Sequence, residues 1–203
     1  AALLAADPEI GAVIAVHLYG HRADMGGLSI LSKQRGVLLI EDAAQAQGGK
    51  HPDGRSFGAA GDLSILSFGH TKILDAGGGG ALLFDEDDFI GHVLDSAANL
   101  PPATNEAALP ELYSLLYYAA WKAYRSDSRF AVLFDPLPEL FRNLFVHSVT
   151  EVQARKIVSV LPYLTEELAH RRELFNIYCD VLQGGAGVIL FENDINLIAP
   201  WRF

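Results

Sequence analysis

The segment Gly36–Gly49, GVLLIEDAAQAQGG, joins a run of apolar residues to two adjacent acids and a small, polar tail. Its apolar part, Val37–Ile40, is typical of a buried β-strand. Such a strand delivers Asp42 to its carboxyl end, and the alternation of side chains directs Glu41 to the opposite face. The amide of Gln45 follows Asp42 by three residues. The segment therefore predicts a central strand that ends in a polar, ligand-binding edge.

The residues before this strand predict a βαβ unit. Ala12–Leu18, AVIAVHL, is rich in β-branched residues and predicts another buried strand. Between the two strands, Asp24–Arg35 spaces its apolar residues as a helix does, and Gly36 supplies a stop. Strand, helix and strand in this order form a right-handed unit with parallel strands. In sheets of this kind ligands bind at the carboxyl ends of the strands.

Further elements follow along the chain. Asp62–Phe68 predicts a third strand, and Gly80–Phe84 predicts a shorter one, which could be antiparallel. The later sequence is mainly helical, and Thr150–Leu182 predicts one long helix or a pair divided at Pro162. A last strand is expected over Val188–Phe191. The first eighty or so residues are therefore predicted to form part of an α/β sheet.

The composition excludes several classes of protein. The 203 residues are half hydrophobic and one fifth charged, which is ordinary for a folded, soluble chain. A formal charge of −10 without a cluster of Lys and Arg argues against a nucleic-acid or membrane partner. The single Cys179 excludes an intrachain disulfide and a cysteine-rich metal site. The longest apolar stretch, Leu115–Trp121, is far shorter than the roughly 20 residues of a membrane span, so a cytoplasmic location is expected.

Several polar groups stand at the predicted strand ends, and together they favour a pyridoxal phosphate site. That cofactor needs a lysine amine for a Schiff base, an acid beside its pyridine nitrogen, and hydroxyls and amides around its phosphate. Lys72, Asp42 and Ser67 could supply these groups. Each also has a structural explanation, since Asp42 could cap a strand and Lys72 could be a solvated loop lysine. The glycines of Gly77–Gly80 fit a tight turn or a close approach of backbone to a ligand.

Three blocks of the sequence carry a family resemblance. AVHLYGHRADM, LLIEDAAQAQGG and GDLSILSFGHTKILDAGGGGALL resemble successive blocks of the DegT-type family of pyridoxal-phosphate-dependent sugar aminotransferases, over roughly residues 10 to 86. The resemblance implies that Lys72 is the Schiff-base lysine and moves the proton. It implies that Asp42 binds the pyridine nitrogen and that Ala44 packs on the ring. It also implies that Gln45 reaches the ring hydroxyl and that Ser67 binds the phosphate.

The same resemblance implies the architecture. The expected fold is α/β of the aspartate aminotransferase type, with a mostly parallel sheet, helices on both faces and a partial small α+β domain. Residues 1–147 would form part of the large cofactor-binding domain, with a helical insertion over about 99–145. Residues 148–203 would form a helix and the start of the small domain. The family pattern also implies that the chain is an internal fragment, without the family's N-terminal part and the end of its C-terminal domain.

The activity that the resemblance implies is the transfer of an amino group from an amino acid, glutamate or glutamine, to a keto sugar. The sugar would be linked to a nucleotide, and the enzyme would be a homodimer with the aromatic segment Tyr113–Phe145 as a candidate contact. Core packing is the alternative for that segment. The chain departs from the family at Gln47, where a histidine is usual, and before Thr150, where an asparagine is expected.

Two other functions are compatible with parts of the sequence. A truncated, non-catalytic family member that serves at most as an interaction module would fit the missing ends. A nicotinamide-binding domain would also place an acid at a strand end, but it requires a G-x-G-x-x-G turn after the first strand. Tyr19–Asp24, YGHRAD, does not fit that turn.

Overall fold

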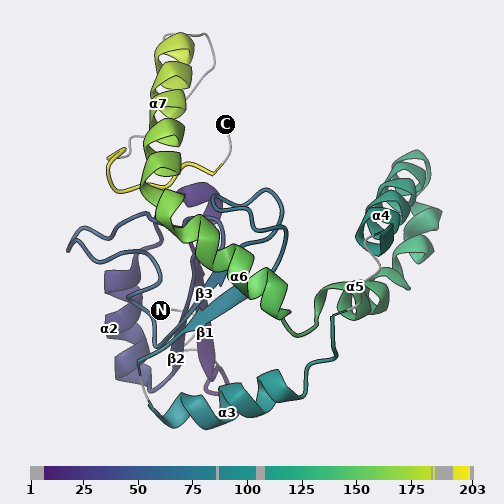
Figure 1. Ribbon diagram of the computed structural model, residues 1–203, viewed down its shortest axis with the longest axis horizontal. Helices are drawn as coiled ribbons and strands as arrows, with labels where there is room; N and C mark the ends of the chain where they lie inside the picture. Colours follow the sequence, from purple (N-terminus) through teal and green to yellow (C-terminus); the bar gives the residue numbers. More distant parts are fainter. Residues whose placement is uncertain (1–6, 86, 104–107, 184, 186–193, 202–203) are drawn as a thin grey trace. The chain divides into compact units, whose positions relative to one another are not determined.

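The computed structural model describes residues 7–85, 87–103, 108–183, 185 and 194–201 (Figure 1). The elements, in chain order, are β1 (Ala12–Val16), the 3-10 turn η1 (Leu18–Gly20), α2 (Met25–Arg35), β2 (Leu38–Asp42), β3 (Leu63–Ser67), β4 (Gly80–Leu83), α3 (Asp87–Ala98), α4 (Ala108–Ser126), η2 (Ser128–Phe134), α5 (Leu137–Phe145), α6 (Glu151–Val160), η3 (Leu161–Tyr163) and α7 (Leu164–Leu182). The strand expected over Val188–Phe191 lies outside the described residues.

The four strands form one mixed sheet in the order β1-β2-β3-β4. The first three are parallel and β4 is antiparallel to β3, which confirms the predicted βαβ unit and the antiparallel fourth strand. In the register of the sheet, Asp42 pairs with Val16 on one side and with Ile65 on the other. Asp42 is therefore the last residue of a central strand, at the carboxyl edge of the parallel part of the sheet.

Helix α2 begins and ends where the sequence predicts. The Asp24 carboxylate accepts a hydrogen bond from the Gly27 N–H at 3.2 Å and caps the first turn. Gly36 ends the helix with a φ of 62°, in the left-handed region that glycine adopts without a Cβ clash. The helix contributes Met25 to a buried apolar cluster with Ala15 and Leu39, which joins α2 to β1 and β2.

A second apolar cluster joins the loop after β3 to helices from the end of the chain. Phe68, Leu74 and Ala76 are buried there against Ile157, Val160 and Leu164. Pro162 lies in the 3-10 turn η3, which separates α6 from α7, so the predicted pair of helices is confirmed. Residues 68–76 therefore pack against helices α6 and α7, whose contacting residues follow more than eighty residues later in the chain.

The chain divides into two compact units. One unit contains Ala1–Asp87 and Glu151–Phe203, and the other contains Asp88–Thr150. This division by contacts places α6 and α7 with the sheet, and it differs from the boundary after residue 147 that the family pattern implies. Whether 1–147 and 148–203 are separate domains of the family kind stays a prediction.

The second unit contains helices α3, α4 and α5 and the turn η2. Its rings contact one another, with Tyr113 packed against Phe141 and Phe145 and with Tyr117 and Tyr124 packed against Phe134. The unit also exposes large apolar side chains, among them Leu115 at 67% and Tyr118 at 59%. Core packing therefore explains only part of the aromatic segment.

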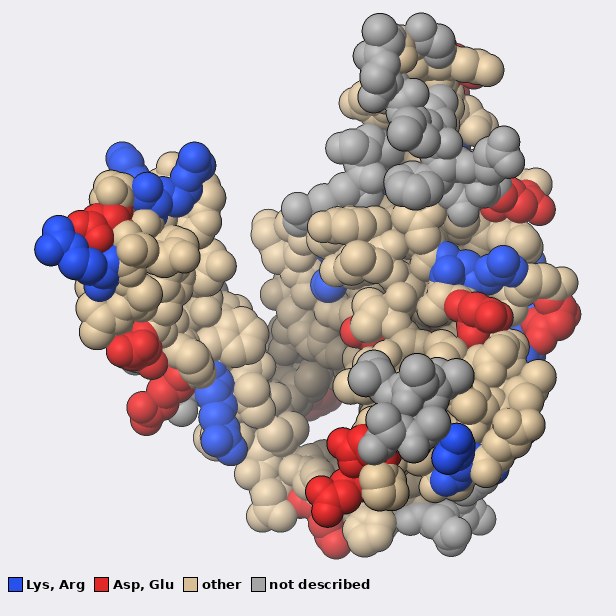
Figure 2. Space-filling view, turned by 180° about the vertical axis from the view of Figure 1, so that it is seen from behind, with Lys and Arg blue, Asp and Glu red and all other residues tan. Residues whose placement is uncertain are grey.

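The charged side chains are dispersed on the face of the molecule in Figure 2. There, Lys and Arg lie in small groups that are separated by acidic and uncharged residues, and the described part of this face gathers no large basic patch. Within the described ranges, no helix combines the length and the apolarity that crossing a bilayer requires.

Candidate active site

The carboxyl edge of the sheet holds Asp42 in a defined orientation. The Asp42 carboxylate, through Oδ1, accepts a hydrogen bond from the Ala44 N–H at 2.9 Å. Its backbone is fixed on both sides, because the Asp42 carbonyl accepts from the His17 N–H and the Ala43 N–H donates to the Ile65 carbonyl, each at 3.0 Å. The side chain is half-buried. A carboxylate placed in this way can hold a cationic nitrogen at the sheet edge.

The loop after Asp42 is tied to two neighbouring turns. Gln45 accepts a hydrogen bond from the Tyr19 N–H through Oε1 at 3.0 Å, which joins the loop to the end of β1. Gln47 accepts from the Leu74 N–H through Oε1 at 3.4 Å, which joins it to the turn that carries Lys72. Gln47, where the family usually has a histidine, is buried and holds this turn.

Ser67 and Lys72 lie on the turn that leaves β3. The Ser67 hydroxyl accepts a hydrogen bond from the Gly69 N–H at 3.4 Å, and the Lys72 N–H donates to the Gly69 carbonyl at 3.1 Å. His70 pairs with Asp75 at 2.9 Å. Thr71, immediately before the lysine, has a φ of 73°, which is rare for a β-branched residue.

The structure therefore brings the predicted residues to one edge. The loop with Asp42, Ala44 and Gln45 and the turn with Ser67 and Lys72 follow the neighbouring parallel strands β2 and β3, and the two are joined by the bond from the Leu74 N–H to Gln47. The side chains of Asp42, Gln45 and Ser67 each accept a hydrogen bond from a backbone N–H group. The individual roles of these residues toward a cofactor stay predictions.

The glycine-rich loop has an internal explanation. Gly77, Gly78 and Gly79 have φ values of 80°, 156° and 86°, which side chains rarely permit. A Cβ on Gly78 would collide with the Gln153 amide of α6, and the Phe68 N–H donates to the Gly79 carbonyl at 2.9 Å. These contacts support a tight turn, and not a close approach to a ligand, because the glycine backbone packs against helix α6 of the same chain.

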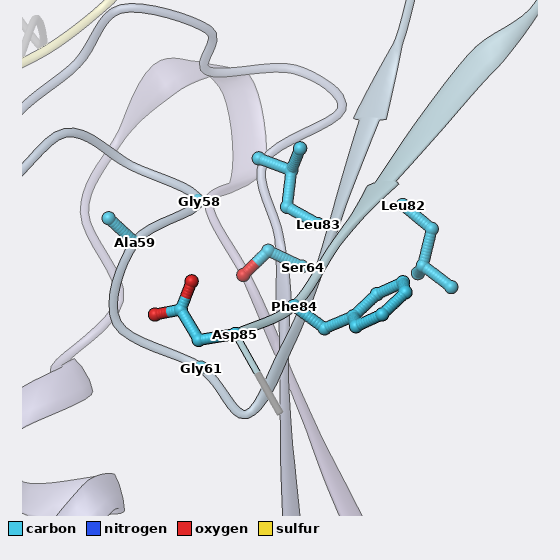
Figure 3. A pocket seen from close by; sticks show the side chains of 8 residues that line it. All are labelled: Gly58, Ala59, Gly61, Ser64, Leu82, Leu83, Phe84 and Asp85. Carbon is cyan, nitrogen blue, oxygen red and sulfur yellow. The ribbon is translucent and has the colours of Figure 1, made fainter. Parts of the chain in front are cut away.

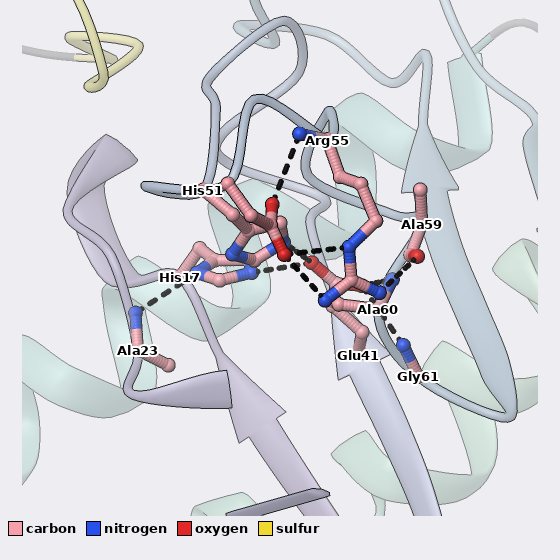
Figure 4. A network of polar contacts seen from close by, with 9 residues as sticks. His17, Ala23, Glu41, His51, Arg55, Ala59, Ala60 and Gly61 are labelled. Atoms are coloured by element: carbon pink, nitrogen blue, oxygen red, sulfur yellow. Dashed lines mark hydrogen bonds and ion pairs between the residues drawn. The ribbon is translucent and has the colours of Figure 1, made fainter. Parts of the chain in front are cut away.

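Behind the sheet edge lies a buried ionic network that the sequence did not predict (Figure 4). Glu41 points away from Asp42 and is fully buried. Its Oε1 accepts from Nε2 of His17 and of His51, each at 2.8 Å. Its Oε2 accepts from the N–H groups of Ala60 and Gly61, at 2.7 and 3.1 Å. Strand alternation correctly predicted the face of Glu41, but the partners come from distant loops.

These donors keep Glu41 ionised. Burial by itself would raise the pKa of Glu41, but the hydrogen bonds from His17, from backbone N–H groups of the loop before β3, and from His51 outweigh it and lower the pKa to about 2. The carboxylate is therefore charged at neutral pH, and it accepts four hydrogen bonds that hold the ends of β1 and β2 and the loop before β3 together.

The same three side chains could in principle bind a metal ion, since their ligand atoms lie within 4.8 Å of one another. The hydrogen bonds argue against this. His17 Nδ1 accepts from the Ala23 N–H at 3.0 Å, so the ring proton lies on Nε2 and points to Glu41. A metal would need the lone pair at that nitrogen. The network is therefore better explained as a structural one.

Trp201 is a second residue that the sequence did not indicate. Its indole N–H donates to the Thr71 carbonyl at 2.7 Å. The distance from Lys72 Nζ to the centroid of the Trp201 ring is 5.4 Å. Tyr19 stacks on the same indole, with 5.6 Å between the ring centroids. An aromatic pair therefore lines the side of the site next to the lysine.

A cavity of about 450 Å³ lies elsewhere on the sheet (Figure 3). It is lined by Gly58, Ala59, Gly61, Ser64, Leu82, Leu83, Phe84 and Asp85. Ser64 stands near the start of β3 and Phe84 follows β4, so the cavity lies at the amino end of the parallel strands. None of the predicted site residues lines it, so this cavity is separate from the candidate site.

Comparison with known proteins supports the family expectation. Residues 4–98 match the DegT/DnrJ/EryC1/StrS aminotransferase family. The dTDP-3-amino-3,4,6-trideoxy-alpha-D-glucose transaminase of Micromonospora megalomicea subsp. nigra is 44% identical over 85 residues, which are 41% of this chain and 22% of that protein. The L-glutamine:2-deoxy-scyllo-inosose aminotransferase of Streptoalloteichus tenebrarius is 43% identical over 76 residues, 37% of this chain and 18% of that protein.

The fold extends the similarity beyond the matched sequence. The solved structure of the E. coli GDP-4-keto-6-deoxy-D-mannose-3-dehydratase with bound hydrated PLP matches with a TM-score of 0.62 and 15% identity, over 94% of this chain and 44% of that one. This structural similarity confirms the fold class. The sequence matches span only about a fifth of the length of the two curated relatives. Over residues 4–98 the sequence is similar to the DegT/DnrJ/EryC1/StrS aminotransferase family, and over 94% of the chain the fold is similar to that of the dehydratase.

Proposed function

We propose that this chain carries the lysine-bearing part of the pyridoxal 5'-phosphate site of an aminotransferase. The observation that carries the proposal is the placement of Lys72 and Asp42 on one sheet edge, where the bond from Leu74 to Gln47 joins their two loops. An amine and a carboxylate held in this way match what the cofactor needs at its two ends. The cofactor bound in the E. coli structure with the same fold supports the same assignment.

The residues at this edge fit the cofactor. Asp42 would hold the pyridine nitrogen, because the Ala44 N–H already orients its carboxylate. Ala44 would pack on the ring, Gln45 would reach the ring hydroxyl, and Ser67 would bind the phosphate. When bound, pyridoxal phosphate supplies a ring that accepts the electrons of the reacting carbon. Lys72 would anchor it covalently and then carry a proton to and from that carbon.

The substrates are proposed from the relatives. Their names describe a nucleotide-linked amino sugar and a transfer from L-glutamine to a cyclic ketone. We extend both to this protein, with glutamine or glutamate as the amino donor and a nucleotide-linked keto sugar as the acceptor. The reaction would serve amino-sugar biosynthesis in the cytoplasm.

The proposed enzyme is a homodimer. Helix α4 exposes Leu112, Leu115 and Tyr118 at 49%, 67% and 59%, and these residues are spaced three apart along one stripe. An exposed apolar stripe of this kind is typical of a protein contact. Sedimentation of the chain and of its Leu115→Asp variant tests the contact, since the charge should shift a dimer toward the monomer. A wild-type chain that sediments as a monomer at all concentrations contradicts it.

The cofactor assignment is tested by titration of the purified chain with pyridoxal 5'-phosphate. Covalent attachment should produce a visible absorption band, and borohydride should fix the label on one lysine. Peptide mass analysis should find that label on Lys72, one of five lysines in the sequence. Lys72→Ala should abolish both the band and the label.

Lys50→Ala is the matched control, because Lys50 is an exposed lysine in the same unit. This variant should keep the band and the label on Lys72. Equal labelling of several lysines, or labelling that Lys72→Ala does not change, would overturn the proposal. That outcome would instead support a non-catalytic member of the family.

A further inference from the structure

The turn before Lys72 is strained. Thr71 has a φ of 73°, in the left-handed region that a β-branched residue adopts only when its surroundings enforce it. Because Thr71 directly precedes Lys72, this backbone conformation sets the direction in which the lysine leaves the turn. A contact that holds Thr71 therefore also holds Lys72.

Trp201 makes that contact from 130 residues away. Its indole N–H donates to the Thr71 carbonyl at 2.7 Å, which is a short bond for a nitrogen donor. Its ring lies 5.4 Å from Lys72 Nζ, close enough for a cation–π contact with the ammonium. The Trp201 side chain thus contacts both the carbonyl of the strained residue Thr71 and the amine of Lys72.

The segment that carries Trp201 is itself firmly held. Arg172 of α7 donates to the Ile198 carbonyl at 3.2 and 3.0 Å, and Arg171 donates to the Trp201 carbonyl at 2.8 Å. Ala199 is fully buried, and its N–H donates to the Gly20 carbonyl at 3.3 Å. The indole is therefore presented to the turn by a fixed backbone.

We propose that Trp201 is a positioning residue for Lys72, which stabilises the strained Thr71 turn through its indole N–H and keeps the lysine amine at the sheet edge through its ring. The inference rests on the proposed function in one respect, because its expected consequence is the attachment of the cofactor at Lys72. The positioning itself is a property of the chain without cofactor, and it can be measured separately.

The first measurement is the rate at which pyridoxal 5'-phosphate attaches to Lys72, trapped by borohydride. Trp201→Phe keeps a ring and removes the N–H, and the loss of one such bond should slow attachment about three- to tenfold. Adding Thr71→Gly should restore most of the rate, because glycine adopts this φ without strain and no longer needs the indole. Thr71→Gly alone should stay within about twofold of the wild type.

The rescue separates positioning from general packing. If Trp201 acted only by stabilising the fold, Thr71→Gly could not recover the rate, and urea unfolding would weaken in parallel with the loss. Trp121→Phe is the matched control, since Trp121 is the other tryptophan and belongs to the other unit. This variant should attach cofactor at the wild-type rate.

The second measurement needs no cofactor. Trace acetic anhydride acetylates all lysines in one sample, and the labelling of Lys72 is divided by that of Lys50 and Lys156. Trp201→Phe should raise this ratio about threefold, because the part-buried amine is released, and Thr71→Gly should return it toward the wild type. A ratio that stays constant or falls overturns the positioning role. A wild-type chain that binds no cofactor but shows the expected ratios refutes the proposed function alone.

Discussion

The buried carboxylate of Glu41 gives the sharpest test of how this fold is held. Glu41→Gln keeps the shape of the side chain and removes its charge, so the two Oε1 bonds from His17 and His51 lose their ionic acceptor. It also places an amide N–H₂ group among donors, where an acceptor is required. We expect the variant to be markedly less stable at neutral pH.

The magnitude follows from the pKa. The pKa of Glu41 is about 2 in the folded chain, against 4.5 for an unperturbed carboxyl. At about 1.36 kcal/mol for each unit, ionised Glu41 contributes about 3 kcal/mol to the free energy of unfolding at pH 7. Because the folded pKa is lowered, this contribution is complete above about pH 4.5 and is lost as the pH falls toward 2. At pH 3 about 1.4 kcal/mol remains.

The assay is urea unfolding of the wild type and of Glu41→Gln at pH 7, 5, 4 and 3. The difference between the two should shrink by about 2 kcal/mol from pH 7 to pH 3, because only the wild type loses an ionised carboxylate there. Glu173→Gln is the control, since Glu173 is exposed on α7, and it should change the stability by less than about 0.5 kcal/mol.

Two results would refute this reasoning. A difference that is large but equal at pH 7 and pH 3 would assign the cost to packing around the amide and not to the charge. A difference below about 0.5 kcal/mol at pH 7 would show that the four hydrogen bonds are replaced by water at no cost.

Three further predictions concern the frame and the site. Asp24→Ala removes the cap of α2 and should lower the free energy of unfolding by about 1 kcal/mol in the same urea assay. Gly20→Ala should lower the free energy of unfolding by more, at least about 3 kcal/mol, because the φ of Gly20 is 85° and a Cβ would collide with the Ala199 carbonyl. Hydrogen exchange should then show faster opening of residues 194–201, and an unchanged exchange rate would contradict the prediction. Asp42→Asn should weaken the binding of pyridoxal 5'-phosphate, measured by the visible band, at least tenfold, because an amide does not hold a cationic nitrogen as a carboxylate does. Its stability in urea should change little. Equal affinities of the wild type and the variant would show that Asp42 does not belong to the site.

Local sequence patterns predicted the sheet because its strands are short, apolar and close together in the chain. Val37–Ile40 indicated a buried strand, and the structure has it as β2 over Leu38–Asp42. Gly36 and Asp24 marked the ends of α2 correctly, since capping depends on neighbouring backbone groups. Pro162 likewise marked the break between α6 and α7. Each of these features depends on residues within one or two turns of one another.

What the sequence by itself determined is the βαβ frame and the delivery of Asp42 and the Lys72 turn to the carboxyl edge, because strand alternation and connection handedness are local rules. The tertiary structure alone decided what holds that edge. Glu41 gains its partners from loops that lie up to 24 residues away, and Lys72 gains Trp201 from 130 residues away. Such contacts depend on how the loops pack around the sheet, and no periodicity in the chain encodes a hydrogen bond across that distance.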